Sequence, residues 1–166
     1  EAALVHGVHL RAGREQRGHH LPIAETCRNH QRRGPPLAAL PQEVGVQAAI
    51  AGAGDLEDEL RARVASARIG YRVRFLGNIS QDEIAAWLAT ADVVAIPSVR
   101  DDSGNVDGLP NIVLETLASG TPLITTPAGG IGSVVQNWQT GVVVPERDAA
   151  ALAEAIASRP GTRANP

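Results

Sequence analysis

Between residues 46 and 156, short apolar runs alternate with amphipathic segments, and this alternation constrains the fold more than any other feature of the chain. Short apolar runs bounded by Gly, Pro or polar residues predict strands, and apolar residues at three- or four-residue steps predict helices. The expected strands are 46–51, 72–76, 92–96, 123–126 and 141–145. Strand and helix alternate about six times, which predicts a doubly wound, Rossmann-like α/β sheet, mostly parallel, with crossover helices.

Capping patterns mark three helix starts. Ser80 and Glu83 have the spacing of a capping box, and Asp55 and Asp148 are expected N-caps. Trp87 falls on the apolar stripe of the helix that follows Ser80. It is therefore expected in the core rather than as a stacking platform for a ligand.

Composition narrows the class of protein. At 166 residues the chain is expected to form one domain. The formal charge of -3 and pI near 5.9 argue against a nucleic-acid binder, although the first third is locally basic. Aromatic residues make up 2 % and Met is absent, so Ala, Val, Leu and Ile must build the core. With no signal segment, no apolar run of roughly 18–20 residues and a single cysteine, Cys27, a cytoplasmic location is expected.

The stretch 107–122 holds the strongest candidate site. Pro110 suits the first turn of a helix, and Gly120 followed by Pro122 closes it, which predicts a helix over 110–119. Asp107 precedes this helix and Glu115 lies about one and a half turns inside it. Free N–H groups at the helix N-terminus suit a phosphate, and a carboxylate that accepts two hydrogen bonds suits the vicinal diol of a sugar or ribose.

Other loops allow two interpretations each. The Gly52–Ala53–Gly54 turn is favoured as a structural turn over a phosphate cradle, because the fingerprint's third glycine is missing and acidic residues follow. The polar loop 99–106 is either functional or simply solvated. Its aspartates lack the spacing of a calcium loop, and the adjacent His19 and His20 are expected at the surface, so no metal site is expected.

The spacing from Asp107 to Glu115 resembles the Glu-x7-Glu motif of family-four retaining glycosyltransferases, also called group 1 glycosyl transferases, with Asp replacing the first Glu. Further matches follow in the family's order over about residues 50–156. They are Leu76–Gly77, Ala91–Asp92, Pro97–Ser98, Gly129–Gly130–Ile131, Thr140–Gly141 and Val144–Pro145. The loop 101–110 is most similar to members that build exopolysaccharide or colanic-acid-type polymers.

The resemblance implies that residues 46–158 form the nucleotide-sugar-binding half of a two-domain GT-B enzyme, after an irregular start at 1–45 and before a tail at 159–166. It implies that Glu115 holds the ribose and Asp107 the donor sugar. The backbone of Gly108, Leu109 and Pro110, with Arg14 and Arg17, would hold the diphosphate; Gly77 and Asn78 would contact the base, and Gly129 and Gly130 would lie near the sugar. For Gly77 and Asn78 a plain βα turn, and for the two arginines solvated surface, are the alternatives.

Two departures from the family pattern concern these roles. The basic motif Arg-x4-Lys near the domain start is not reproduced, since none of Arg11, Arg14 and Arg17 is followed by a Lys at that spacing. Val134 stands where the family usually has an acidic residue after the glycine pair. The first departure concerns the diphosphate ligands and the second concerns the sugar pocket.

The implied function is transfer of a sugar from a nucleoside diphosphate sugar to a polysaccharide or lipid-linked acceptor, with retention. No cofactor, metal or nucleic acid is implied. The acceptor domain of related enzymes is not found in these 166 residues, so a non-catalytic nucleotide-sugar-binding fragment is one alternative and a nucleotide-sugar epimerase another. A cytoplasmic location is implied, with a peripheral position at the inner membrane face as the alternative.

Overall fold

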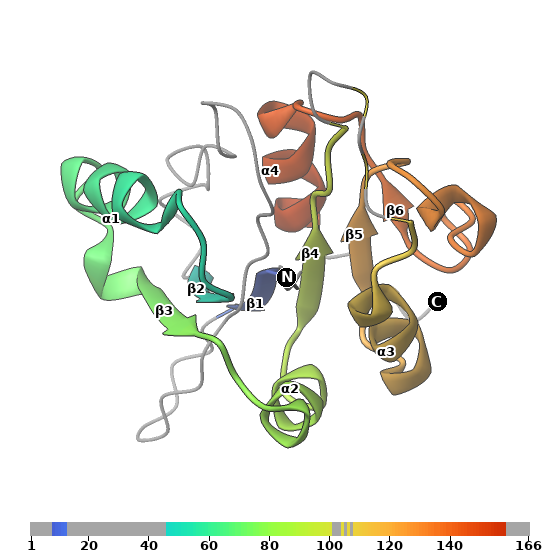
Figure 1. Ribbon diagram of the computed structural model, residues 1–166, viewed down its shortest axis with the longest axis horizontal. Helices are drawn as coiled ribbons and strands as arrows, with labels where there is room; N and C mark the ends of the chain where they lie inside the picture. Colours follow the sequence, from blue (N-terminus) through green and yellow to red (C-terminus); the bar gives the residue numbers. More distant parts are fainter. Residues whose placement is uncertain (1–7, 13–45, 101–103, 105, 107, 159–166) are drawn as a thin grey trace.

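The computed structural model describes residues 8–12, 46–100, 104, 106 and 108–158, and in this part of the chain six strands form one sheet (Figure 1). The strands are β1 (Val8–Ala12), β2 (Val46–Ala51), β3 (Val73–Gly77), β4 (Val93–Ile96), β5 (Leu123–Thr125) and β6 (Val142–Val143). The order across the sheet is β3-β2-β1-β4-β5-β6. This is the order of a Rossmann sheet, whose two halves meet where the order reverses, between β1 and β4.

Five of these strands run in one direction. β2 pairs with β3, β4 with β5, and β5 with β6, all in parallel, whereas β1 is antiparallel to both β2 and β4. The predicted mostly parallel, doubly wound sheet is therefore confirmed, with β1 as the exception. β1 was not predicted, although Val8, Leu10 and Ala12 alternate with polar residues at the period of a strand.

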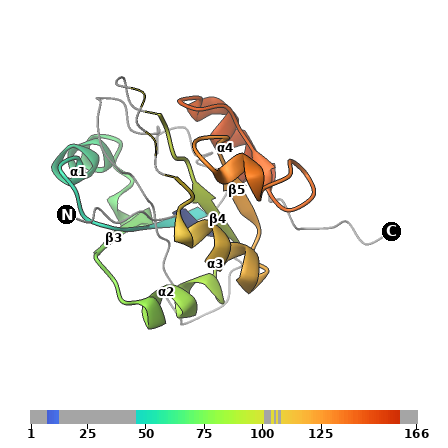
Figure 2. The same ribbon diagram turned by 45° about the vertical axis from the view of Figure 1, so that its right-hand side comes forward.

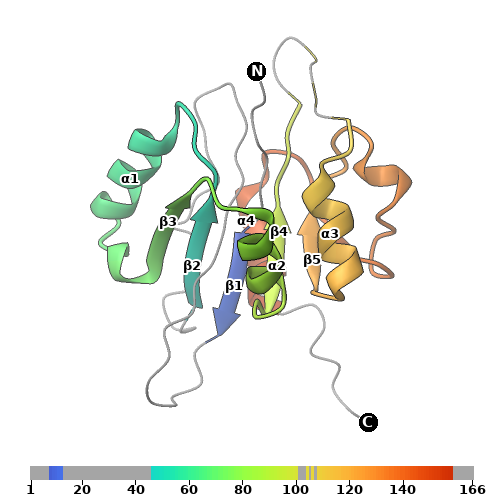
Figure 3. The same ribbon diagram turned by 60° about the horizontal axis from the view of Figure 1, so that its bottom comes forward.

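Helices cover both faces of the sheet. They are α1 (Glu57–Ser66), α2 (Gln81–Leu88), α3 (Asn111–Ser119) and α4 (Ala149–Ser158), with 3-10 turns at η2 (Gly70–Arg72) and η3 (Ile131–Ser133). Figure 3 shows α2 and α3 in front of the strands and α4 behind them. This covering of both faces is what the alternation of strands and helices predicts.

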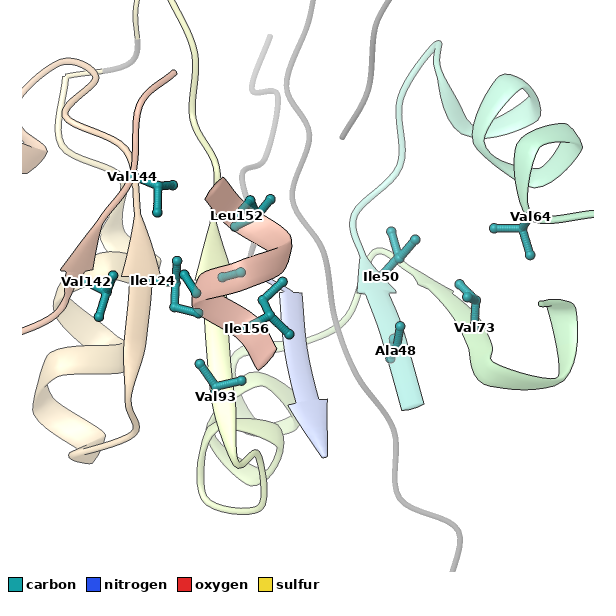
Figure 4. Packing of buried hydrophobic residues seen from close by; sticks show 13 residues of the cluster. Ala48, Ile50, Val64, Val73, Val93, Ile124, Val142, Val144, Leu152 and Ile156 are labelled. Carbon is teal, nitrogen blue, oxygen red and sulfur yellow. The ribbon is translucent and has the colours of Figure 1, made fainter. Parts of the chain in front are cut away.

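Successive side chains of β4 point to opposite faces of the sheet, so β4 contributes to two core clusters, one on each face. Val93 and Ala95 pack with α4 residues such as Leu152 and Ile156 in one cluster (Figure 4), whereas Val94 and Ile96 pack with α2 and α3 in the other. Every fully buried apolar side chain among the described residues is Ala, Val, Leu or Ile, as composition predicts. Trp87 is half-buried against the α4-side cluster, so its predicted place in the core is confirmed.

Two of the three predicted helix caps are present. The Glu83 N–H donates to Ser80 Oγ at 3.3 Å while the Ser80 N–H donates to Glu83 Oε2 at 2.8 Å, which completes the capping box of α2. Asp148 Oδ1 accepts from the Ala151 N–H at 2.9 Å.

The predicted cap of α1 is wrong. Its N-cap is Leu56 rather than Asp55, and no side chain makes a capping hydrogen bond there. The Gly54 carbonyl accepts the Glu57 N–H at 3.0 Å, so a backbone carbonyl of the preceding turn makes a hydrogen bond of the kind expected from the Asp55 side chain.

The start of α3 differs by one residue from the prediction. Pro110 is the N-cap, with extended backbone angles of φ -62° and ψ 129°, and the helix proper begins at Asn111. Gly120 closes the helix in the left-handed conformation at φ 72°, as predicted.

Candidate functional site

The carboxyl ends of β2 to β6 meet at one edge of the sheet, the upper edge in Figure 3. The chain leaves these strands through Gly52, Asn78, Pro97, Thr126 and Val144. The helix α3 also begins at this edge. Since ligands of open α/β sheets bind outside the carboxyl ends of the strands, the candidate site lies here.

The N-terminus of α3 is open to an anion, because among the described residues no side chain caps it and its first turn contains no acidic residue. By contrast, α1 begins with three acidic residues, and Ser80 and Asp148 cap the starts of α2 and α4. The Val113 N–H donates to the Pro110 carbonyl at 3.0 Å, and the N–H groups before it in the first turn, with the positive end of the helix dipole, favour an anion. Of the four helix starts, that of α3 is therefore the best suited to a phosphate.

Glu115 is held from a neighbouring helix. It is half-buried on α3, and its Oε1 accepts a hydrogen bond from Gln81 Nε2 at 3.2 Å. Gln81 is the first residue of α2, which lies beside α3 (Figures 2 and 3). A carboxylate offers about four lone-pair directions, so this bond orients Glu115 and leaves capacity for the hydroxyls of a ligand. Sequence reasoning missed Gln81, because 34 residues separate it from Glu115.

The glycine pair after β5 supports the start of α3. The Gly130 N–H donates to the Gly108 carbonyl. A Cβ on Gly130 would lie 2.9 Å from that carbonyl oxygen and 3.3 Å from Leu109 Cβ, so only glycine fits. Gly129 is left-handed at φ 57°. The structure thus brings Gly130 to the Gly108–Leu109 segment just before Pro110, and the predicted place of Gly129 and Gly130 near the donor sugar stays a prediction.

The turns after β2 and β3 are joined to each other. The Gly52 N–H donates to the Gly77 carbonyl at 2.7 Å, and Gly77 has a left-handed φ of 64°. This use of the Gly52 N–H supports the structural interpretation of the Gly52–Ala53–Gly54 turn. Asn78 is exposed at the same edge, where the predicted contact with a base stays a prediction.

Several predicted site residues lie outside the described part of the chain. They are Asp107, Arg14 and Arg17, and their roles stay predictions. Within the described residues, no group of three or more His, Cys, Asp or Glu side chains is placed to hold a metal. In that same part, no helix has the length and apolarity needed to cross a bilayer.

At this edge the pKa of one carboxyl group, that of Glu83, is shifted. The Ser80 hydroxyl, and after it the Ser80 backbone N–H, lower the pKa of Glu83 below its usual range, against a smaller opposing effect of desolvation. Both donors belong to the capping box, so the lowered pKa of Glu83 has a structural cause at the start of α2.

Comparison with known families gives these features a context. The family model described as "Glycosyl transferases group 1" matches residues 34–159, about three quarters of the chain. The chain belongs to this family. The predicted family is therefore confirmed.

Curated relatives of the chain include a glycogen synthase and a putative colanic acid biosynthesis glycosyltransferase. Glycogen synthase of Mycobacterium tuberculosis (strain CDC 1551 / Oshkosh) is 38 % identical over 126 residues, which is 74 % of this chain and 29 % of the relative. The putative colanic acid biosynthesis glycosyltransferase WcaL of Escherichia coli (strain K12) is 33 % identical over 144 residues, 87 % of this chain and 33 % of the relative. The chain thus spans about a third of the length of these relatives.

Solved structures have the same fold. Anabaena HepE in complex with UDP superposes with a TM-score of 0.63 at 24 % identity, over 74 % of this chain and 33 % of that one. Sucrose-phosphate synthase from Thermosynechococcus elongatus gives 0.56 at 30 % identity, over 66 % and 28 %. In both comparisons the chain corresponds to about a third of the larger protein.

Proposed function

We propose that this chain is the donor-binding domain of a retaining glycosyltransferase, which transfers a sugar from a nucleoside diphosphate sugar to a polysaccharide or lipid-linked acceptor. The observation that carries the proposal is the open N-terminus of α3 with Glu115 oriented on the same helix by Gln81. An anion site and a hydroxyl-binding carboxylate on one helix suit a molecule that joins a diphosphate to a ribose.

The diphosphate would lie at the start of α3. There the positive end of the helix dipole and the backbone of Gly108, Leu109 and Pro110 would meet the phosphates, with Gly130 holding the Gly108 carbonyl. Arg14 and Arg17 would add cations. Preorganised N–H groups and guanidinium groups stabilise the charge that develops on a departing diphosphate, and they do so without acting as a base.

The two carboxylates would divide the sugars between them. Glu115 would accept from the ribose hydroxyls through lone pairs that Gln81 leaves available. Asp107 would accept from the hydroxyls of the transferred sugar, with a side chain one bond shorter than the family's Glu but of the same charge. Gly129 would lie near that sugar as well.

Gly77 and Asn78 are the proposed base contacts, and the relatives leave the base itself open. HepE is described in complex with UDP-glucose, at 24 % identity. A GDP-mannose-dependent phosphatidylinositol monomannoside mannosyltransferase of Mycobacterium tuberculosis is 35 % identical over 114 residues. A test must therefore include both bases.

The test is thermal unfolding with UDP, GDP, ADP, UDP-glucose and GDP-mannose. A ligand that binds only the folded chain at 100 times its Kd raises the free energy of unfolding by about 2.7 kcal/mol. We expect one base to stabilise the chain and Glu115→Ala to abolish most of that gain. Glu154→Ala, an exposed site on α4, serves as the matched control. Equal stabilisation of Glu115→Ala and the unchanged chain would contradict the assignment of Glu115.

A second candidate function is nucleotide-sugar binding without transfer. It needs only the helix start and the oriented carboxylate of α3, which the described residues provide. Release of nucleoside diphosphate from the bound nucleotide sugar separates the two functions. Slow hydrolysis of the donor, lost in Glu115→Ala, would support a catalytic domain, whereas binding without any release would support the binding fragment.

A further inference from the structure

The helices α2 and α3 are joined by hydrogen bonds near both ends of α2. At its first residue, Gln81 Nε2 donates to Glu115 Oε1 at 3.2 Å. At its last residue, the Leu88 carbonyl accepts from Thr121 Oγ1 at 2.7 Å, just after α3 has ended. Figures 2 and 3 show the two helices side by side. The contact of Gln81 with Glu115 is therefore part of a wider interface between the helices.

Apolar packing fixes the two helices between these hydrogen bonds. Leu88 of α2 is buried in one cluster with Ile112 and Val113 of α3, and Ile84 packs against the same cluster. Close-packed interiors of this kind resist displacement. At the start of α2 the capping box fixes the backbone of the first turn, which contains Gln81. The backbone of Gln81 is thus held in place without any ligand.

The hydrogen bond from Gln81 orders the Glu115 side chain before a ligand binds. A glutamate loses rotamer freedom when its carboxylate is fixed, and this entropy cost offsets part of the contact that fixes it. Because Gln81 already holds one carboxylate oxygen, a ligand at Glu115 bears less of this cost. An ordered carboxylate also presents its remaining lone pairs in defined directions.

The lone pairs that Gln81 leaves on Glu115 match the two hydroxyls of a ribose. A carboxylate accepts about four hydrogen bonds and donates none. Gln81 uses one position on Oε1, so positions on both oxygens are left for two O–H donors on adjacent carbons. A 2′-deoxyribose brings one donor fewer to a half-buried carboxylate. Sites built to bind a hydroxyl reject an analogue that lacks it, because a polar group is left unpaired.

We propose that Gln81 is a positioning residue that makes the donor site select ribonucleoside diphosphates over 2′-deoxyribonucleoside diphosphates. It acts through Glu115 and does not itself touch the ligand. This inference rests on the proposed function and narrows the class of donor. Sugars carried on a ribonucleoside diphosphate are substrates, whereas sugars carried on deoxythymidine diphosphate are rejected.

The test is calorimetric titration with UDP, GDP and ADP, each against its 2′-deoxy form, so that the members of a pair differ in one hydroxyl. For the unchanged chain we expect the ribonucleotide to bind about tenfold more tightly, the effect of one hydrogen bond to a charged group. Gln81→Glu has nearly the same shape but no N–H donor, and it should reduce the ratio of the two affinities to about threefold or less. Gln81→Lys keeps an N–H donor and should restore the ratio.

Gln139→Glu is the matched control, because it makes the same substitution at an exposed glutamine in the turn before β6. It should leave the ratio of affinities unchanged. A further acidic residue in the first turn of α2 suits the helix dipole, so Gln81→Glu is not expected to lower the unfolding midpoint. A general loss of stability would weaken both nucleotides of a pair equally, and the ratio separates that effect from positioning.

A ratio near one for the unchanged chain would overturn the proposal, as would a ratio in Gln81→Glu as large as in the unchanged chain. In both cases the donor site itself would stand. Binding of a ribonucleoside diphosphate by the unchanged chain reports on the proposed function separately. If none of these nucleotides binds, the donor site is refuted and the positioning role falls with it.

Discussion

The helices α2 and α3 begin at the same edge of the sheet, but side chains cap the N-terminus of α2 and none caps that of α3. At α2, Ser80 and Glu83 satisfy each other's backbone N–H groups, and Asp82 and Glu83 place negative charge in the first turn. At α3, Pro110 offers no side-chain hydrogen bond, and the first turn is uncharged.

The contrast separates a helix start that serves the fold from one that can serve a ligand. At α2 the protein's own side chains use the N–H groups and the positive end of the helix dipole. At α3 the same physical resources stay available to an anion from solution. The two helices meet through Gln81 and Glu115, so the satisfied helix orients the carboxylate of the open one.

The largest effect is expected when an added side-chain atom crowds the backbone just before the N-terminus of α3. Gly130→Ala places a Cβ 2.9 Å from the Gly108 carbonyl oxygen, a backbone atom that cannot turn aside as a flexible side chain would. We expect a loss of about 2 kcal/mol in the free energy of unfolding, typical of overpacking, and loss of most nucleotide-dependent stabilisation. Urea unfolding with and without nucleoside diphosphate measures both.

Gly132→Ala is the matched control for this change. Gly132 is exposed, and a Cβ there meets nothing within 4 Å. Its stability and its response to nucleotide should stay close to those of the unchanged chain. If Gly130→Ala behaved in the same way, the support of Gly108 by Gly130 would not matter to the site.

A smaller effect is expected from making the start of α3 resemble that of α2. Asn111 is exposed at the first position of the helix, so Asn111→Asp changes the charge with almost no change in shape. Without ligand the new carboxylate should stabilise the helix by about 0.5 kcal/mol through the dipole. With ligand it should repel the diphosphate and lower the affinity about tenfold, the equivalent of roughly 1.4 kcal/mol.

Asn111→Ala distinguishes charge from the loss of the amide. Titration of each variant with the nucleoside diphosphate, at low and at high salt, measures the effect. The penalty in Asn111→Asp should shrink as salt screens the repulsion, whereas any penalty in Asn111→Ala should not. A salt-independent loss in both would show that repulsion of an anion is not the cause.

The smallest effect is expected at the capped N-terminus of α2, in the pH dependence of stability. Because the pKa of Glu83 is lowered in the folded chain, the unfolded chain binds more protons as the pH falls through the carboxyl range. The stabilisation by Glu83 should therefore be fully present above its unfolded pKa and be lost as the pH falls through the lowered folded pKa. Unfolding midpoints of Glu83→Gln and the unchanged chain, measured across this range, should converge in acid.

Glu83→Gln also sharpens the comparison between the helices. Its nucleotide affinity near neutral pH should equal that of the unchanged chain, because Glu83 is occupied with Ser80. A clear loss of affinity would mean that the start of α2 takes part in binding after all.

Local features of the fold were predictable. The capping box at Ser80, the cap at Asp148, the left-handed Gly120 and the buried strands all follow from interactions within a few residues. The missed cap of α1 shows the limit of such rules. The Gly54 carbonyl accepts the Glu57 N–H at 3.0 Å, and no side chain, that of Asp55 included, makes a capping hydrogen bond at this helix start.

By itself the sequence determined the doubly wound class, the helix α3 and the family, because periodicity, capping and the spacing of motif residues are properties of neighbours along the chain. Only the tertiary structure decided the antiparallel β1 and the contacts of Gln81 with Glu115, of Gly130 with Gly108, and of Glu146 with Arg100. The side-chain contacts of Gln81 and Glu146 join residues 34 and 46 positions apart, respectively. Their geometry depends on the order of strands in the sheet, which no local pattern encodes.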